Sequence, residues 1–260
     1  MKSFGQGTSI KGFAKDDLAS FKLQFPELAE QQKIADCLTS LDEVIAAQGR
    51  IVAALKAHKR GLMQQLFPRE GETRPRLRFP EFRNAPEWEL AQLGDVCRPQ
   101  QWQTISSLDL IADGFPVYGA NGFIGYYSTF NHEFETVAVT CRGSTCGEVL
   151  LIPPKSYITG NSMCLDEIDA KKHSYHFIFH LLKHRGLRDV ISGSAQPQIV
   201  GKAIRNLKFL LPKLPEQQRI ADCLSSLDDQ IAVQSHQLAA LKTHKQGLMQ
   251  QLFPAPGQAP

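Results

Sequence analysis

The chain has 260 residues, of which 42% are apolar and 21% are charged, and its formal net charge is +3. These values are typical of a globular protein with one large or two modest domains. No run approaches 18 apolar residues and the N-terminus lacks the apolar core of a signal peptide, so we expect neither a membrane span nor a secretion signal. The weak positive charge permits nucleic acid as a partner without requiring it.

Six cysteines are scattered along the chain, a usage that favours a reducing cytoplasm as the location of the protein. Cys141 and Cys146 have no His or Cys pair nearby at zinc-ligand spacing, so we expect no metal there. Cys37 and Cys223 occupy equivalent positions next to the helix seam and are expected to be small core residues.

Residues 1–27 are too short to form a domain. They match residues 187–213 at a constant offset, with Gly7 aligned to Gly193 and Pro26 to Pro212. We therefore expect residues 1–27 to be the tail of an incomplete first domain.

Residues 28–68 and 214–254 are copies of one segment, with 29 of 41 positions identical at an offset of 186. Apolar residues recur in steps of three and four in both copies, a pattern that predicts a long helix with a coiled-coil seam. Prolines lie only near the ends of each segment. A helix of this length cannot cover its apolar stripe alone. The two helices should pack on each other or on the same helices of another copy.

Polar residues of the two segments are repeated as faithfully as the seam, although a seam requires only the apolar positions. This indicates that the helices also contact a partner. The expected partner-binding residues are Glu30, Gln31, Gln32, His58, Gln64, Glu216, Gln217, Gln218, His244 and Gln250.

Residues 69–213 should form the central domain, opened by an Arg- and Pro-rich link at 69–87. Short β-prone runs separated by Gly and Asn turns predict strands at 115–119, 123–127, 136–141, 148–152, 156–160 and 207–212. A helix is expected across 173–191. The predicted fold class is α+β: a mixed α/β domain with a curled sheet, joined to two long helices. Residues 255–260 should be a flexible tail.

We find no enzyme signature in the chain: no phosphate-binding loop, no amino-methyltransferase motif and no common nuclease core. Four histidines, at positions 173, 176, 180 and 184, are spaced like a metal-binding helix face but lack acidic or Cys partners nearby. We expect a solvated or DNA-facing helix edge instead, with no metal, no catalytic residue and no cofactor bound by this chain.

The loops between the predicted strands carry Arg, Asn, Gln and hydroxyl side chains. In the major groove Arg pairs with guanine and Asn or Gln with adenine, while Ser, Thr and Lys suit phosphates. Each of these residues alone is an ordinary turn residue, but the set favours recognition of double-stranded DNA. The expected DNA-binding residues are Tyr118, Asn121, Arg142, Ser144, Thr145, Asn161, Gln196, Gln198 and Lys202.

The repeated pattern L-x-EQQ-[KR]-IADCL-x-SLD, followed by LK-x-HK-x-GLMQQLFP, resembles the specificity (HsdS) subunits of type I restriction-modification systems. FPVYGANGFIGYY at 115–127 and GSAQPQIVGKAIRNLKFLLP at 193–212 resemble the opening and close of that family's target recognition domain. The resemblance covers nearly the whole chain.

The resemblance implies a non-catalytic subunit in which two recognition domains alternate with two long helices paired as an antiparallel coiled coil. Each domain would bind half of a bipartite DNA site. The helices would dock the modification subunit HsdM, which carries S-adenosylmethionine, and the restriction subunit HsdR would join for cleavage.

This chain departs from the family in holding one complete recognition domain. Two copies could pair as a homodimer through the helices, or one could act as a half-subunit. The alternative function is a coiled-coil adaptor whose central domain binds protein. The DNA target does not follow from the sequence.

Overall fold

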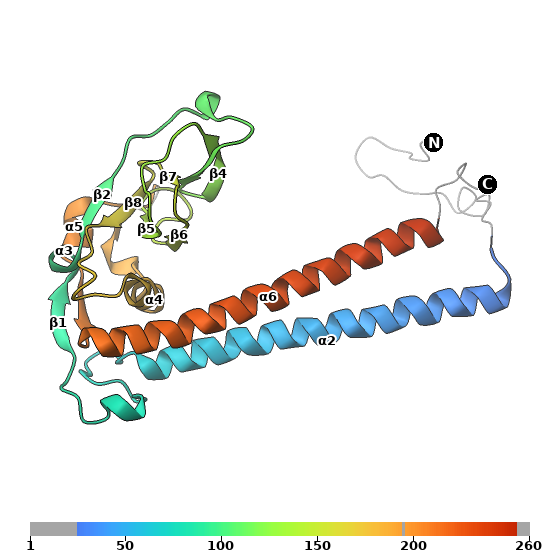
Figure 1. Cartoon of the computed structure of the whole chain (residues 1–260), viewed down its shortest axis with the longest axis horizontal. Helices are drawn as coiled ribbons and strands as arrows, with labels where there is room; N and C mark the ends of the chain where they lie inside the picture. Colours follow the sequence, from blue (N-terminus) through green and yellow to red (C-terminus); the bar gives the residue numbers. More distant parts are fainter. Residues whose placement is uncertain (1–24, 194–195, 254–260) are drawn as a thin grey trace. The chain divides into compact units, whose positions relative to one another are not determined.

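The computed structural model describes residues 25–193 and 196–253 (Figure 1). The chain divides into two compact units. Unit 1 holds described residues 25–51 and 234–253, and unit 2 holds described residues between 52 and 233. Two helices, α2 (Leu28–Leu66) and α6 (Leu214–Leu252), each contribute to both units. Most of the expected N-terminal tail, and the expected flexible tail at 255–260, lie outside the described residues.

Both long helices are confirmed, and each ends two residues before the proline that closes its segment. In unit 1, Gln48 Nε2 donates to Gln234 Oε1 over 2.7 Å, and Lys245 Nζ lies 2.5 Å from Asp42 Oδ1. The partner number on α6 falls as the number on α2 rises, so these two segments are antiparallel. In unit 2, Lys59 Nζ lies 2.5 Å from Asp228 Oδ2.

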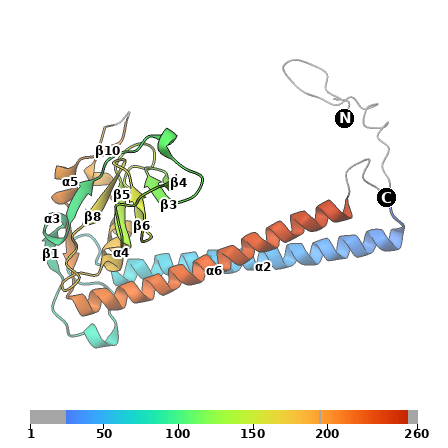
Figure 2. The same cartoon turned by 45° about the horizontal axis from the view of Figure 1, so that its top comes forward.

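The strands of unit 2 form four small open sheets, labelled in part in Figures 1 and 2. The largest has the order β2-β8-β5-β6, and all of its pairs are antiparallel. Its strands are β2 (Arg98–Gln101), β8 (Ser162–Asp166), β5 (Thr136–Thr140) and β6 (Val149–Ile152). A three-stranded sheet has the order β4-β3-β7, from β4 (Gly122–Tyr127), β3 (Phe115–Gly119) and β7 (Tyr157–Ile158).

Two further sheets have two strands each. The pair β1 (Glu89–Gln92) and β11 (Lys208–Leu211) brings together the segments by which the chain enters and leaves the central domain. The pair β9 (Ile191–Ser192) and β10 (Gln198–Ile199) flanks a short loop. All six predicted strands are present. Five strands were not predicted: β1, β2, β8, β9 and β10. In β2, Pro99 argues against a strand, because proline cannot donate a main-chain hydrogen bond.

Helix α4 (Tyr175–Arg185) is shorter than the expected helix across 173–191. Ser174 caps its start by accepting a hydrogen bond from Phe177 N, and Gly186, with φ of 73°, ends it. A short 3-10 turn, η3 (Arg188–Val190), follows. The remaining short elements are α3 (Leu93–Val96), α5 (Gly201–Arg205), η1 (Pro80–Phe82) and η2 (Ser107–Asp109).

The main core of unit 2 joins the four-stranded sheet, α4 and the unit-2 parts of the long helices. Val137 of β5 and Phe177 of α4 are fully buried, and so are Leu66 of α2 and Leu224 of α6. Since these residues come from elements far apart in sequence, the central domain is packed onto the helices rather than tethered to them. No helix among the described residues is long and apolar enough to cross a membrane.

Candidate nucleic-acid interface

The loop that follows β5 carries Arg142 and is attached to the segment around Gln198. Arg142 and Gln198 form an isolated antiparallel bridge. On either side, Gly143 N donates to Pro197 O over 3.2 Å and Ile199 N donates to Cys141 O over 3.0 Å. Two polar side chains that are 56 positions apart in the sequence therefore project from one short ladder.

Two more of the predicted loops meet this ladder. Thr145 Oγ1 donates to Ala120 O over 2.6 Å and lies 3.3 Å from Asn121 Oδ1. Cys141 N donates to Asn161 O over 3.0 Å. The loops at 118–121, 141–145, 161 and 196–198 are thus held in one cluster by main-chain and hydroxyl hydrogen bonds.

The predicted DNA-binding residues differ in how much of each is exposed to solvent. Asn121, Ser144, Arg142, Gln196 and Gln198 are exposed, whereas Tyr118, Thr145 and Asn161 are half-buried. Within the described part of the chain, Arg142 makes no ion pair.

The half-buried members support the loops instead. The hydroxyl of Thr145 is hydrogen-bonded to the 120–121 loop and is not free for DNA. Tyr118 packs edge-on against Phe123 with ring centroids 6.1 Å apart, and burial raises the pKa of its phenol.

A basic groove of about 410 Å³ lies beside β2 and α5, and the sequence analysis missed it. Its lining includes Arg98, Gln100 and Gln101 from β2 and Arg205 from α5. Gln101 Nε2 donates to Gly160 O over 2.7 Å and to Cys141 Sγ over 3.0 Å, which ties the groove to the loop cluster. Lys202, also on α5, is exposed, but no described contact joins its side chain to the loops.

The four histidines at the start of and along α4 do not face one site. His176 Nε2 lies 3.1 Å from Glu135 Oε2, and His180 Nε2 lies 3.2 Å from Ser225 Oγ. The ring of His184 stacks on Phe67 with centroids 5.0 Å apart. The expectation of a solvated or DNA-facing edge is wrong for His180, which is fully buried, while His184 is partly buried against Phe67 and the side chain of His176 stays 34% exposed.

Among the described residues, one group has metal-ligand geometry: His132, Cys164 and Asp166, whose ligand atoms lie within 4.8 Å of one another. The Asp166 carboxylate accepts a hydrogen bond from Trp102 Nε1 over 3.0 Å and lies 3.1 Å from His132 Nε2. Burial raises the pKa of the Cys164 thiol, which disfavours the thiolate a metal would need. We interpret the group as a polar network that anchors the Trp102 loop.

The predicted partner-binding residues fall into two groups. Eight are exposed on the long helices: Glu30, Gln31, Gln32, His58, Gln64, Gln218, His244 and Gln250. The other two, Glu216 and Gln217, are 3% and 1% exposed. Their burial leaves no surface for another protein, so we no longer place them among the partner-facing residues.

Glu216 and Gln217 bind the chain's own central domain. Arg78 donates to both carboxylate oxygens of Glu216, over 2.8 and 2.5 Å. Gln217 Oε1 accepts from Ser174 N over 3.0 Å, and its Nε2 donates to Pro212 O over 2.8 Å. These residues fasten the start of α6 to the link, to the start of α4 and to the end of β11.

Curated relatives of the chain are specificity subunits. The chain is 24% identical over 284 residues to the type I restriction enzyme MjaVIII specificity subunit of Methanocaldococcus jannaschii, covering 97% of this chain and 66% of that protein. It is 26% identical over 141 residues to the EcoprrI specificity subunit of Escherichia coli, covering 52% of this chain and 35% of that protein. The chain thus spans less than two thirds of these relatives' lengths.

Solved structures share the fold. The type I restriction-modification S subunit from M. genitalium matches with a TM-score of 0.68 and 19% identity, over 97% of this chain and 68% of that one. The HsdS subunit from Thermoanaerobacter tengcongensis matches with a TM-score of 0.53 and 20% identity, over 95% of this chain and 64% of that one. The model of the type I restriction modification DNA specificity domain matches residues 1–57 and 86–243, and the chain belongs to this family.

Proposed function

We propose that this chain recognises DNA sequence for a type I restriction-modification complex, and that its central domain binds half of a bipartite target. The observation that carries the proposal is the bridge between Arg142 and Gln198, which presents a guanidinium and an amide from one rigid ladder. In the major groove a guanidinium pairs with two acceptors of guanine and an amide with adenine. Each such pair discriminates by about 1–3 kcal/mol.

The neighbouring groups suit the phosphate backbone. Ser144 and Lys202 are exposed, and Arg98 and Arg205 line the groove beside the loops. Phosphate contacts hold a protein in register on the duplex but carry no sequence information. We therefore assign base recognition to Arg142, Gln198, Gln196 and Asn121, and positioning on DNA to the groove and to Lys202.

The long helices are proposed to act as a scaffold. We propose that they pair as an antiparallel coiled coil and that the exposed polar repeats contact the modification subunit HsdM, with the restriction subunit HsdR joining the complex. In this proposal residues 69–213 form the recognition domain, with a sheet that curls as a whole, and residues 1–27 are the tail of a first such domain. The chain is non-catalytic, works in the cytoplasm and leaves S-adenosylmethionine to HsdM.

Two copies of the chain are proposed to pair through the helices, which would place two recognition domains on a palindromic bipartite site. Light scattering of the chain alone and with HsdM tests this, since a strict monomer in both samples would contradict it. The alternative function, an adaptor that binds protein through its central domain, predicts no DNA binding. Steep loss of DNA affinity with rising salt would favour DNA recognition over the adaptor.

The test of DNA recognition is to sequence the methylated adenines in cells that carry the assembled complex. Arg142→Ala and Gln198→Ala should relax or abolish the target at separate base positions while the chain stays folded. Arg83→Ala, at an exposed position of the link, is the matched loss of one guanidinium and should leave the target unchanged. Unaltered methylation in both loop variants would refute the assignment.

A further inference from the structure

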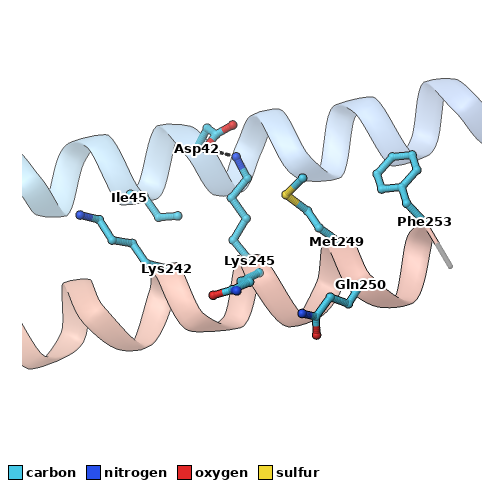
Figure 3. A pocket seen from close by; sticks show the side chains of 8 residues that line it. Asp42, Ile45, Lys242, Lys245, Met249, Gln250 and Phe253 are labelled. Atoms are coloured by element: carbon cyan, nitrogen blue, oxygen red, sulfur yellow. Dashed lines mark hydrogen bonds and ion pairs between the residues drawn. The ribbon is translucent and has the colours of Figure 1, made fainter. Parts of the chain in front are cut away.

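Apolar surface is exposed in both units. In unit 1 it borders a groove of about 640 Å³, which is lined by Met249 and by the ion pair of Lys245 and Asp42 (Figure 3). In unit 2 it includes Phe123 of β4, whose exposed fraction is 51%. Phe123 follows directly after the loop at 118–121, which belongs to the candidate nucleic-acid interface. For Phe123, the neighbouring loops therefore indicate what covers the ring.

A β-bulge fixes the direction of the Phe123 side chain. The register of β3 on β4 shifts between Val117 and Tyr118, and Ile124 is the extra residue on β4. Residues three apart on a regular strand point to opposite faces. The extra residue instead brings Phe123 and Tyr126 to the same face, where their ring centroids lie 5.2 Å apart at an interplanar angle of 68°.

Two tyrosines hold the ring of Phe123 in place. Tyr118 is its partner across the hairpin, with ring centroids 6.1 Å apart, and Tyr126 makes the second edge-on contact. Both tyrosines are half-buried, so Phe123 is the most exposed of the three rings. Edge-to-face pairs are favourable beyond the area that they bury. A ring that is already restrained loses little conformational entropy when it contacts a partner.

The turn that precedes β4 joins this aromatic cluster to the loops with the predicted base contacts. Thr145 Oγ1 donates to Ala120 O over 2.6 Å, and Thr145 lies in the same loop as Arg142. Asn121, which we assign to base recognition, is exposed in the same turn as Ala120. Phe123 thus lies two residues from one proposed base contact, and its hairpin is hydrogen-bonded to the loop of another.

The thymine 5-methyl group is the part of DNA that best suits an exposed phenyl ring at this place. The other proposed base contacts are guanidinium and amide groups, which recognise hydrogen-bonding edges. Apolar side chains, phenylalanine among them, contact the thymine methyl group in the major groove. An amide such as that of Asn121 pairs with adenine, and adenine is itself paired with thymine. A methyl group is therefore present in the same base pair as any adenine that Asn121 recognises.

We propose that Phe123 is a specificity-determining residue whose ring contacts the 5-methyl group of a thymine in the half-site. The proposal rests on DNA recognition by the central domain, and it adds an apolar contact to the polar ones. If a protein subunit covered the ring instead, binding would not depend on the thymine methyl group.

Deoxyuridine tests this contact, because it pairs like thymidine but lacks the methyl group. The probes are a fluorescein-labelled duplex with the target found from the methylated adenines and a set in which one thymine at a time is replaced by uracil. Binding is measured with the complex of the full chain and HsdM. At one position, uracil should weaken binding to the wild type about fourfold, as expected for the loss of one buried methyl-sized group. Phe123→Ala should bind the thymine and uracil duplexes equally well.

Phe134→Ala is the matched control, because it removes the same ring from a residue that is 77% exposed. Phe134 precedes β5 whereas the Arg142 loop follows it, so the two lie at opposite ends of this strand. This variant should keep the full preference for thymine. Phe123→Leu retains an apolar side chain and should keep a smaller preference, which separates loss of the contact from misfolding of the hairpin.

Three results would overturn the proposal. One is equal binding of thymine and uracil duplexes by the wild type at every position, and another is an unchanged preference for thymine in Phe123→Ala. Sequence-specific binding with either result would leave the proposed DNA recognition intact. The third is the absence of sequence-specific DNA binding by the wild-type complex, which would overturn the proposed function together with this contact.

Discussion

Gln48 Nε2 donates a hydrogen bond to Gln234 Oε1 over 2.7 Å, and the two residues occupy the same position of the internal repeat. Contact between equivalent positions means that the helix pairing in unit 1 has a local two-fold axis at this pair. A polar residue in an apolar seam fixes register at a cost in stability. We infer that this pair keeps the two helices aligned.

Replacing both glutamines with leucine should therefore raise stability and reduce specificity of pairing. The double variant Gln48→Leu, Gln234→Leu should unfold at a higher temperature and should form mixed oligomers, because the apolar seam no longer penalises other registers. Thermal denaturation and light scattering measure the two effects. A lower unfolding temperature with unchanged mass would show that the pair contributes net stability instead.

The buried pair of Arg78 and Glu216 should be essential for holding the central domain on α6. The two side chains are 7% and 4% exposed, so Arg78→Ala leaves a buried carboxylate without a counter-charge and should cost about 3 kcal/mol. Arg98→Ala is the control, since its pair with Glu167 is about two-thirds exposed and should contribute less than about 1 kcal/mol. Urea unfolding of both variants provides the comparison, and equal losses would contradict it.

Stability should fall in acid because of His180. Burial first, and then the neighbouring Lys59, His176 and Lys183, lower the pKa of His180 to about 3, while Asp228 lies 3.9 Å from its Nδ1. The unfolded chain binds this proton near pH 6.5 and the folded chain does not. Stability is therefore complete above pH 6.5 and is lost as the pH falls toward 3, by about 1.4 kcal/mol per pH unit.

The variant His180→Gln removes this titration. Urea unfolding between pH 7.5 and 4.5 should show a shallower loss of stability in the variant than in the wild type. Equal slopes in the two proteins would mean that His180 does not govern the acid response.

Gln101 should position the loop cluster rather than contact a base. Its amide joins Gly160 O and Cys141 Sγ, so Gln101→Ala loosens two loops at once. We expect weaker DNA binding by the assembled complex with the same methylated sequence, because the base-facing side chains are unchanged. A change of target in this variant would indicate direct base contact. Gln100→Ala is the control, because Gln100 lines the same groove on the same strand but does not join the two loops. Equal loss of DNA binding in both variants would assign the effect to the groove rather than to the position of the loops.

Local pattern was enough to predict both long helices and six of the eleven strands in the described part of the chain. The seam of α2 and α6 has a period of three and four residues, and the strands alternate with Gly and Asn turns. Both patterns can be recognised from residues that are close together in the sequence. The end of α4 at Gly186 was missed because the apolar pattern continues to Leu187, while a single residue with positive φ decides where the helix stops.

The sequence alone determined the duplication, the two long helices, six of the strands and the polar loops that belong to the candidate interface. Tertiary structure alone decided which loops meet, because strand order and register place Arg142 beside Gln198. It also decided which residues of each copy of the repeat are buried. Glu30 and Glu216 have nearly the same local sequence, yet Glu30 is exposed and Glu216 is only 3% exposed, because burial depends on which distant residues pack against a side chain.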